Sequence, residues 1–298
     1  MGESLIYRGE FVGARTHFER ANSLYDPIQH RWLAAILGGF DFGAHSLTYV
    51  GAILWYLGYP DQAVDRLERA LALARKVSNL FSISLALYYM SRIQASRGEG
   101  EAALKAADAL VLLATEEGLQ QWIVYGRFAL ALGRLADQGQ AEAGIGQLRE
   151  GLASMRPSGA RAGRTVFCTA IAEGCGILGR VEDGLAAVTE ALAAADENEE
   201  RFYEAEIHRF KGELLLKQSN SNTTEAQNCF ERAIEIARNQ SAKSWELRAT
   251  MSLARLLDQQ GSRDTARTML AKIYNWFTEG FDTADLKDAK TLLDELNR

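Results

Sequence analysis

Few residues of this chain have the types and spacing that catalysis needs. The stretch GARAGRT, from Gly159 to Thr165, has the composition of a phosphate-binding loop, but its spacing is wrong, an arginine replaces the lysine, and no strand precedes it. The tripeptide from Asp41 to Gly43 matches a kinase motif but lacks every partner motif. The sequence therefore predicts no catalytic residue, no metal site and no cofactor. The four histidines have no carboxylate or cysteine at metal-ligand spacing: His17, His30, His45 and His208.

Arginine and aromatic side chains offer the chemistry of binding instead. Guanidinium groups pair bidentately with carboxylates, so arginines gathered on one surface would suit an acidic peptide or a C-terminal carboxylate. For Trp55 and Trp122, packing between helices is the more frequent role of an aromatic residue at helical spacing. For Arg248 and Arg255, seven residues apart, a solvated stripe is an equally good explanation. The candidate binding residues are His45, Trp55, Tyr56, Tyr88, Arg92, Trp122, Tyr125, Arg127, Arg209, Glu213, Arg248 and Arg255.

A repeated spacing is what would bring these residues to one surface. In the first clear example, Gly58 is followed by Ala63 five residues later, Leu67 nine later and Ala70 twelve later. The pattern recurs, with Ser221 in place of one glycine. Its small residues fall at 14, 63, 103, 144, 184, 226 and 266, so the intervals are 49, 40, 41, 40, 42 and 40 residues. So steady a period predicts a repeat protein of seven units.

Helix packing explains the offsets. A glycine ends one helix by adopting a positive φ, and Pro60 suits the first turn of the next helix, where its missing N–H costs nothing. The later offsets are spaced by four and three, so they share one helical face, and the small residue allows close approach of the preceding helix. Apolar-periodic stretches between these helices predict further helices at 44–57, 80–97, 120–138, 162–178, 200–218 and 243–260.

These elements predict an all-α fold, a right-handed α-solenoid of about seven helix-turn-helix repeats in a single domain, 1–298. The first interval is nine residues too long, and the excess, 27–46, is expected to form a short helix and a loop. No polar cap precedes the first unit, which suggests a chain cut from a longer polypeptide. The expected units lie near 1–26, 42–77, 79–117, 119–156, 160–197, 199–239 and 241–279, with a capping helix at 283–298.

Composition narrows the classes of partner. The net charge of −6 and a pI of about 5.4 argue against a broad basic face for nucleic acid. No apolar run is long enough to span a membrane, and no secretory leader is visible. The three cysteines share no metal spacing and are expected to be reduced and packed. We expect a cytoplasmic protein with neither a nucleic-acid nor a membrane partner.

The order of glycine, alanine, large apolar residue and alanine resembles the tetratricopeptide repeat, with units of 40 or 41 residues instead of 34. Longer stretches, among them LWYLGYPDQA, YEAEIHRFKGELLL and WFTEGFDTADLKDAKTLLDEL, are similar to one bacterial group. This is the C-terminal tetratricopeptide region of multidomain regulators that carry a class III adenylate or guanylate cyclase, or another output domain, ahead of a signal-transduction ATPase. The resemblance implies that this region senses signals or binds partners and that catalysis belongs to upstream domains.

The resemblance also implies that the first helix of each pair lines a concave groove. We therefore predict a non-catalytic protein–protein interaction and regulatory scaffold for signal transduction, whose groove holds a peptide, a protein partner or an upstream domain of the same polypeptide. A small-molecule sensor is the first alternative, and a deep pocket lined by Tyr88, Trp122 and Tyr125 would favour it. A homo-oligomerisation module is the second, and a large isologous interface would favour that one.

Overall fold

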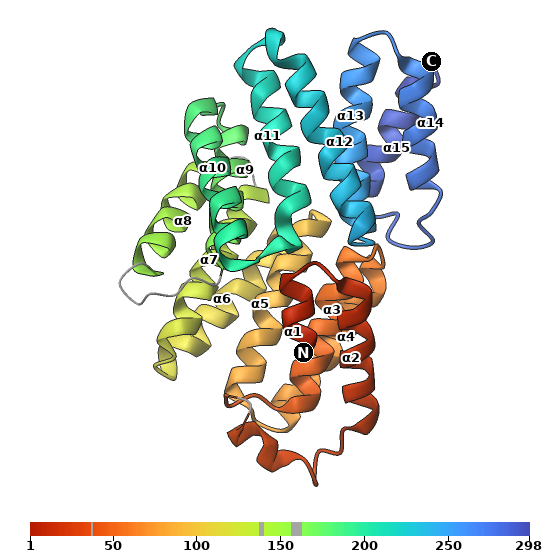
Figure 1. Ribbon diagram of the computed structural model, residues 1–298. Helices are drawn as coiled ribbons and strands as arrows, with labels where there is room; N and C mark the ends of the chain where they lie inside the picture. The colour runs from red at the N-terminus through yellow and green to blue at the C-terminus, as the bar shows by residue number, and fades with distance from the viewer. Residues whose placement is uncertain (37, 137–139, 156–162) are drawn as a thin grey trace.

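The computed structural model of the chain describes residues 1–36, 38–136, 140–155 and 163–298. These residues form helices joined by short loops, and none of them lies in a strand (Figure 1). The predicted all-α fold is confirmed. Within the described residues, no helix is long and apolar enough to cross a membrane.

The described helices form seven successive pairs, with α15 (Ala284–Leu296) after the last. The first members, here called the A helices, are α1 (Gly2–Tyr7), α3 (Phe42–Tyr56), α5 (Leu80–Arg97), α7 (Gln120–Ala136), α9 (Arg164–Ile177), α11 (Glu204–Gln218) and α13 (Lys243–Gln259). The second members, the B helices, are α2 (Phe11–Leu24), α4 (Pro60–Lys76), α6 (Gly100–Glu116), α8 (Ala141–Met155), α10 (Val181–Asn198), α12 (Thr223–Asn239) and α14 (Arg263–Tyr274). Short 3₁₀ helices occur at η1 (Arg31–Ala35), η3 (Arg201–Tyr203) and η4 (Asn220–Asn222).

The sequence periodicity located the A helices to within a few residues where the structure describes them. The long first interval contains η1 and its flanking loops, as expected. The predicted helices 120–138 and 162–178 extend into residues outside the described ranges, as do the units 119–156 and 160–197 and the start of the GARAGRT stretch. We retain the unit boundaries as a proposal, with one helix pair to each unit.

The repeated spacing packs each B helix against its own A helix. Gly58 has a φ of 90° and ends the first helix of its pair, and α4 begins two residues later at Pro60. Ala63 is fully buried where α4 crosses α3. A Cβ added at Gly51 of α3 would lie 3.0 Å from the carbonyl oxygen of Ala63, so the two backbones almost touch. The small residue in the pattern is therefore required by the distance between the helices.

Lengthening this small side chain should be costly. We expect Ala63→Leu to reduce the free energy of unfolding by about 1–3 kcal/mol, because the added atoms overpack a closed helix crossing. Ala72→Leu makes the same chemical change at an exposed position of the same helix and should alter stability by no more than about 0.5 kcal/mol. Urea unfolding followed by circular dichroism would compare them, and equal effects would contradict the packing argument.

The solenoid closes on itself. Helices α13 and α14, near the C-terminus, stand directly over α2 and α4, near the N-terminus (Figure 1). Ser244 of α13 donates a hydrogen bond of 2.6 Å to the carbonyl oxygen of Trp55 in α3. The rings of Trp55 and Trp245 meet with centroids 4.8 Å apart. The C-terminal helices therefore cover the inner surface at this point.

Charged groups hold this closing contact at the start of α4. Glu279 accepts hydrogen bonds from the backbone N–H groups of Asp61 and Gln62, at 2.9 and 3.0 Å, and so caps a helix more than 200 residues earlier in the chain. Arg97 at the end of α5 bridges Asp61 and Asp282, at 2.9 and 3.4 Å. The two ends of the solenoid are thus joined by hydrogen bonds and ion pairs as well as by aromatic packing.

Three of the repeat glycines also make room for the closing contact. Added Cβ atoms would lie 2.4 Å from the Gln240 side chain at Gly9, 2.7 Å from the Cβ of Lys243 at Gly58 and 2.7 Å from the Cβ of Ala284 at Gly98. The equivalent Gly261 has no atom within 4 Å of such a Cβ. The loops of the first three pairs therefore serve both to reverse the chain and to dock its C-terminal part.

Gly98→Ala and Gly261→Ala separate these two roles. Both glycines have a left-handed backbone, with φ of 83° and 81°, so both variants carry the conformational cost of alanine there. Only Gly98→Ala also collides with Ala284. We expect it to lower the free energy of unfolding by about 1–3 kcal/mol more than Gly261→Ala does. Equal losses in thermal or urea unfolding would show that the closing contact is not tightly packed.

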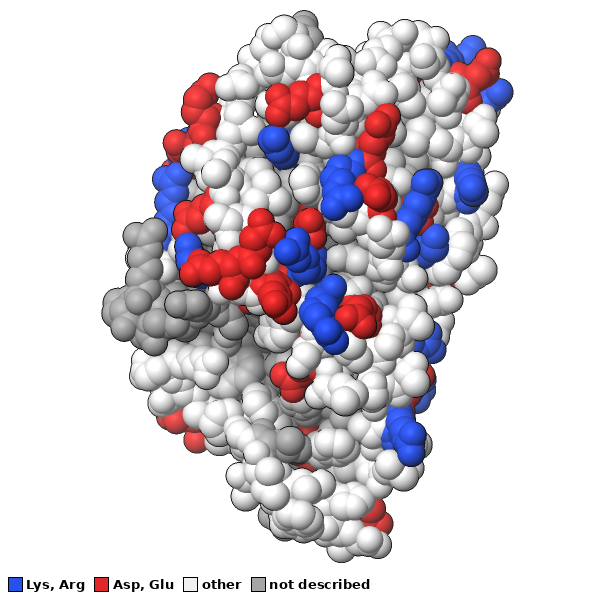
Figure 2. Space-filling model, in the orientation of Figure 1, with Lys and Arg blue, Asp and Glu red and all other residues white. Residues whose placement is uncertain are grey.

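Charged side chains of both signs are interspersed on the face shown in Figure 2, mostly over its upper half, and much of the lower half is uncharged. Blue and red groups often lie next to one another there. Neither sign forms a continuous stripe across that face.

Candidate functional site

A cavity of about 440 Å³ lies inside the closed solenoid, on the side of the A helices. Its lining comes from α1, α3, α5, α7, α9 and η3, so side chains far apart in sequence meet around one space. Residues that line it are Glu3, Ile6, Tyr7, Gly38, Phe40, His45, Tyr49, Phe81, Leu85, Tyr88, Tyr89, Arg92, Gln121, Trp122, Tyr125, Gly163, Val166, Phe167 and Phe202.

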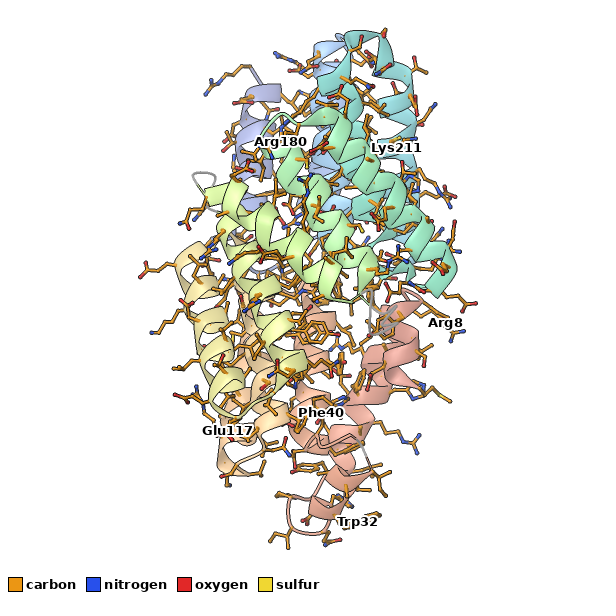
Figure 3. The ribbon with its side chains drawn as sticks, turned by 90° about the vertical axis from the view of Figure 1, so that its left-hand side faces the viewer. Arg8, Trp32, Phe40, Glu117, Arg180 and Lys211 are labelled. Carbon is orange, nitrogen blue, oxygen red and sulfur yellow. The ribbon has the colours of Figure 1, made fainter. Side chains whose placement is uncertain are left out.

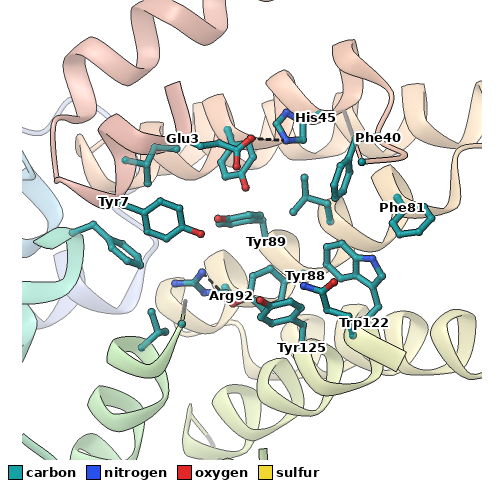
Figure 4. A pocket seen from close by; sticks show the side chains of 18 of the residues that line it. Glu3, Tyr7, Phe40, His45, Phe81, Tyr88, Tyr89, Arg92, Trp122 and Tyr125 are labelled. Atoms are coloured by element: carbon teal, nitrogen blue, oxygen red, sulfur yellow. Dashed lines mark hydrogen bonds and ion pairs between the residues drawn. The ribbon is translucent and has the colours of Figure 1, made fainter. Parts of the chain in front are cut away.

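Aromatic rings form most of the walls (Figure 4). Tyr88 meets Tyr89 and Tyr125 with ring centroids 5.2 and 5.3 Å apart, and Tyr125 meets Trp122 at 5.7 Å. Phe40 continues the wall, 6.2 Å from Trp122 in an edge-on arrangement. Such offset and edge-on contacts hold each ring in place, so the wall is a rigid apolar surface with phenolic hydroxyls at its edges.

One positive charge is buried at this wall. The side chain of Arg92 is 6% exposed, and it donates hydrogen bonds to the hydroxyl of Tyr203 at 2.9 Å and to that of Tyr88 at 3.4 Å. Its guanidinium carbon lies 5.2, 5.4 and 5.7 Å from the ring centroids of Tyr88, Tyr89 and Tyr203. Its Nε has no hydrogen-bond partner, and no ion pair joins it to a described carboxylate. Neutral phenols surround the charge without compensating it.

A further polar contact at the cavity joins Glu3 of α1 to His45 of α3, with an Oε1–Nε2 distance of 3.1 Å. The hydrogen bond from His45 lowers the pKa of Glu3, so its carboxylate is ionised at neutral pH. Burial raises the pKa of Tyr7 to about 12, so its hydroxyl remains neutral. Figure 4 shows Glu3 and Arg92 on opposite sides of the space, with Tyr7 and Tyr89 between them.

A network of charges occupies the neighbouring part of the interior. Arg209 of α11 contacts both oxygens of Glu206, at 2.7 and 2.8 Å, and Oε1 of Glu213 at 2.7 Å. Arg248 of α13 contacts Glu206 at 3.3 Å and Asp285, at the start of α15, at 2.7 Å. Both guanidinium groups are thus neutralised by carboxylates of the same chain.

Glu206 is central to this network because both arginines share it. Burial alone would raise its pKa, but Arg209 and Arg248 outweigh burial, and the pKa lies below the ordinary value of 4.5. A carboxylate with a lowered pKa in the folded state stabilises the fold above its ordinary pKa, and this contribution is lost as the pH falls through the lowered value. The stabilisation from Glu206 is therefore fully present at neutral pH.

We expect Glu206→Gln to lower the free energy of unfolding by about 3–5 kcal/mol at pH 7, because it leaves two buried guanidinium groups short of a counter-charge. Glu235→Gln breaks an exposed pair with Arg232 and should cost no more than about 0.5 kcal/mol. The difference between wild type and Glu206→Gln should shrink below pH 4.5 as Glu206 itself becomes protonated. Urea unfolding across pH measures both effects, and a pH-independent difference would contradict them.

The structure separates the candidate binding residues into four groups. Trp55 and Tyr56 belong to the packed interior: Trp55 lies in the closing contact, and Tyr56 stacks on Phe11 with centroids 4.8 Å apart. Arg127 and Arg255 are exposed and do not line the cavity. The charge network contains Arg209, Glu213 and Arg248, and the cavity wall contains His45, Tyr88, Arg92, Trp122 and Tyr125.

The arginines therefore do not form one stripe that faces a partner. Arg209 and Arg248 are paired with carboxylates of the chain, whereas Arg92 contacts hydroxyls and rings and has no described carboxylate partner. Sequence reasoning missed much of the cavity wall, which comes from helix positions next to those it chose, from α1, and from loops. A tyrosine pair at 88–89 and a tyrosine one turn after His45 were the available signals. The missed residues include Glu3, Tyr7, Phe40, Tyr49, Tyr89 and Phe202.

Comparison with known proteins agrees with this geometry. Residues 44–84, which span α3, α4 and the start of α5, match the family model described as a tetratricopeptide repeat. The chain carries a tetratricopeptide-repeat region. The crystal structure of the apo form of RapI covers 99% of this chain and 96% of its own, with a TM-score of 0.58 and 13% identity. At 13% identity, this match shows a similarity of fold alone.

Two further matches cover only part of the matched protein. It is 23% identical over 241 residues to the uncharacterized protein R02095 of Rhizobium meliloti, a match that covers 78% of this chain and 22% of that protein. It thus spans about a fifth of the length of the curated relative. The crystal structure of yeast Tom70 covers 96% of this chain and 58% of its own, at 16% identity and a TM-score of 0.49.

Proposed function

We propose that this chain is a non-catalytic sensor module, which binds a small ligand inside the closed solenoid and regulates an output elsewhere in a larger signalling protein. The observation that carries the proposal is the cavity of about 440 Å³, walled by Tyr88, Trp122 and Tyr125, with Arg92, which no described carboxylate neutralises, at its lining. A cavity of this size lies within the usual range for small-molecule sites, about 300–1,000 Å³.

The contacts that close the solenoid favour a small ligand over an extended peptide. The C-terminal helices cover the inner surface at Trp55, and the charges beside the cavity are already paired. An extended peptide would have to displace these contacts, whereas a small ligand needs only the existing space. The rigid aromatic walls also reduce the entropy that binding would cost, since little has to be ordered.

The placement of the cavity suggests how binding could be transmitted. Its lining joins α1, at the N-terminal end, to α9 and η3, more than 150 residues later. A ligand that contacts all of these elements would favour the closed solenoid over more open arrangements, in proportion to its difference in affinity for the two. Such a difference would give a neighbouring domain two states to recognise.

The resemblance to the C-terminal region of bacterial cyclase and ATPase regulators supports a cytoplasmic signalling context. The match to the curated relative covers only 22% of that protein, so most of the relative lies outside the matched region. We propose that the regulated output, a nucleotide cyclase or a signal-transduction ATPase, lies in another part of the parent protein.

Protein–protein interaction is the second candidate function, and the segment around η1 favours it. Four apolar side chains there are 62–88% exposed, more than an isolated surface residue would explain. Figure 3 shows Trp32 of η1 at the lower tip of the molecule, away from Phe40 at the cavity wall. A partner bound there would leave the cavity free, so the two functions are compatible. The exposed residues are Leu24, Ile28, Trp32 and Ile36.

Blocking the cavity tests the sensor function. Gln121 is exposed at the cavity and Gln120 is exposed beside it without lining it, so Gln121→Trp should obstruct the space and Gln120→Trp should not. After incubation with a bacterial small-molecule extract, native mass spectrometry should find a bound compound on wild type and on Gln120→Trp, and little or none on Gln121→Trp. Equal binding to all three proteins, or none to wild type, would contradict the proposal.

A further inference from the structure

We propose that the ligand of the cavity is a small monoanion with an aromatic ring, whose carboxylate pairs with Arg92 while its ring packs among Tyr88, Trp122 and Tyr125. This inference rests on the proposed sensor function and adds the chemical class of the ligand. It follows from three features of the cavity: the unpaired cation, the aromatic wall and the carboxylate on the opposite side.

The unpaired cation is the first feature. Three arginines of the described residues are less than 10% exposed: Arg92, Arg97 and Arg209. Arg97 contacts Asp61, Glu99 and Asp282, and Arg209 contacts Glu206 and Glu213. Among the described residues, Arg92 has only phenolic hydroxyls and ring faces as partners, and its Nε has none.

Burying a charge without a counter-charge costs free energy, so an anion that binds beside Arg92 would stabilise the folded state. A guanidinium fork can donate two parallel hydrogen bonds to a carboxylate, and the buried Nε of Arg92 has no hydrogen-bond partner among the described residues. Arg92 lines the cavity, so the anion that would pair with it is expected to come from a ligand in the cavity and not from a neighbouring helix.

The aromatic wall determines the chemical character of the rest of the ligand. Phe40, Tyr88, Trp122 and Tyr125 form a chain of rings with centroids 5.3–6.2 Å apart, along one side of the cavity (Figure 4). A flat ring can pack against such a surface in the offset or edge-on geometry that the wall itself uses. A sugar or a short aliphatic acid would leave these faces unfilled.

Glu3 limits the number of negative charges. Its carboxylate faces the cavity from the side opposite Arg92, and among the described residues its side-chain partner is His45. A ligand with anionic groups at both ends would place one of them beside Glu3, where like charges repel. The cavity thus suits one acidic end, an aromatic body and a second end that is neutral or positively charged.

Four related compounds test the class on the wild-type protein: indole-3-propionate, its neutral amide, tryptamine and propionate. Isothermal titration should find that the aromatic acid binds at least ten-fold more tightly than the amide, that tryptamine binds more weakly still, and that propionate does not bind measurably. Equal affinity for acid and amide, or tighter binding of tryptamine, would overturn the proposed class and leave the sensor function standing.

Variants at Arg92 test whether its charge causes the preference for the acid over the amide. Arg92→Lys should keep a preference for the acid over the amide, and Arg92→Met should abolish it. In the absence of ligand, Arg92→Met should lower the thermal midpoint far less than Arg209→Met, which strands the buried Glu206. If the two methionine variants are equally destabilised, Arg92 is a structural residue and the proposal fails.

Failure of the ligand class and failure of the sensor function give different results. If none of the four compounds binds but the extract still yields a compound on wild type and not on Gln121→Trp, the class is wrong and the cavity still binds a ligand. If neither experiment detects binding, both proposals are overturned.

Discussion

The contact between the C-terminal helices and the first three helix pairs determines what the inside of this solenoid can be. Glu279 caps α4, Arg97 joins the start of α4 to Asp282, and Trp245 packs on Trp55. These contacts turn a surface that an open solenoid would present to solvent into an interior. Once the surface is interior, each polar group on it must find a partner within the chain or bind something that enters.

The polar groups of the interior are partnered in one region and left available for a ligand in another. Around Arg209 and Arg248 the chain supplies its own carboxylates, so this region is a rigid, self-sufficient network. Around Arg92 it supplies aromatic rings and hydroxyls but no described carboxylate, and it leaves a space. The same residue type is therefore structural in one place and available for a ligand in the other. The difference lies in the neighbouring side chains and not in the arginines themselves.

One repeated sequence feature serves two purposes in this arrangement. The glycines that follow α1, α3, α5, α9 and α13 have a positive φ and allow the chain to reverse there. At Gly9, Gly58 and Gly98 the missing side chain also lets the C-terminal helices approach, whereas Gly261 has open space at the same position of the pattern. Local constraints made glycine available at all of these loops, and the closed fold uses it at the first three.

The sequence by itself determined the helices and their pairing order, because these depend on spacings of three, four and about forty residues. It singled out Tyr88, Arg92 and Trp122, which line the cavity. It also chose Arg127 and Arg255 for the same surface, and these two are exposed away from the cavity. Only the tertiary structure decided that the ends meet, since closure sums small rotations over seven helix pairs, and no local pattern records that sum. It also decided which arginines are neutralised, because the partners of Arg97 and Arg248 at 282 and 285 reach them only when the solenoid has closed.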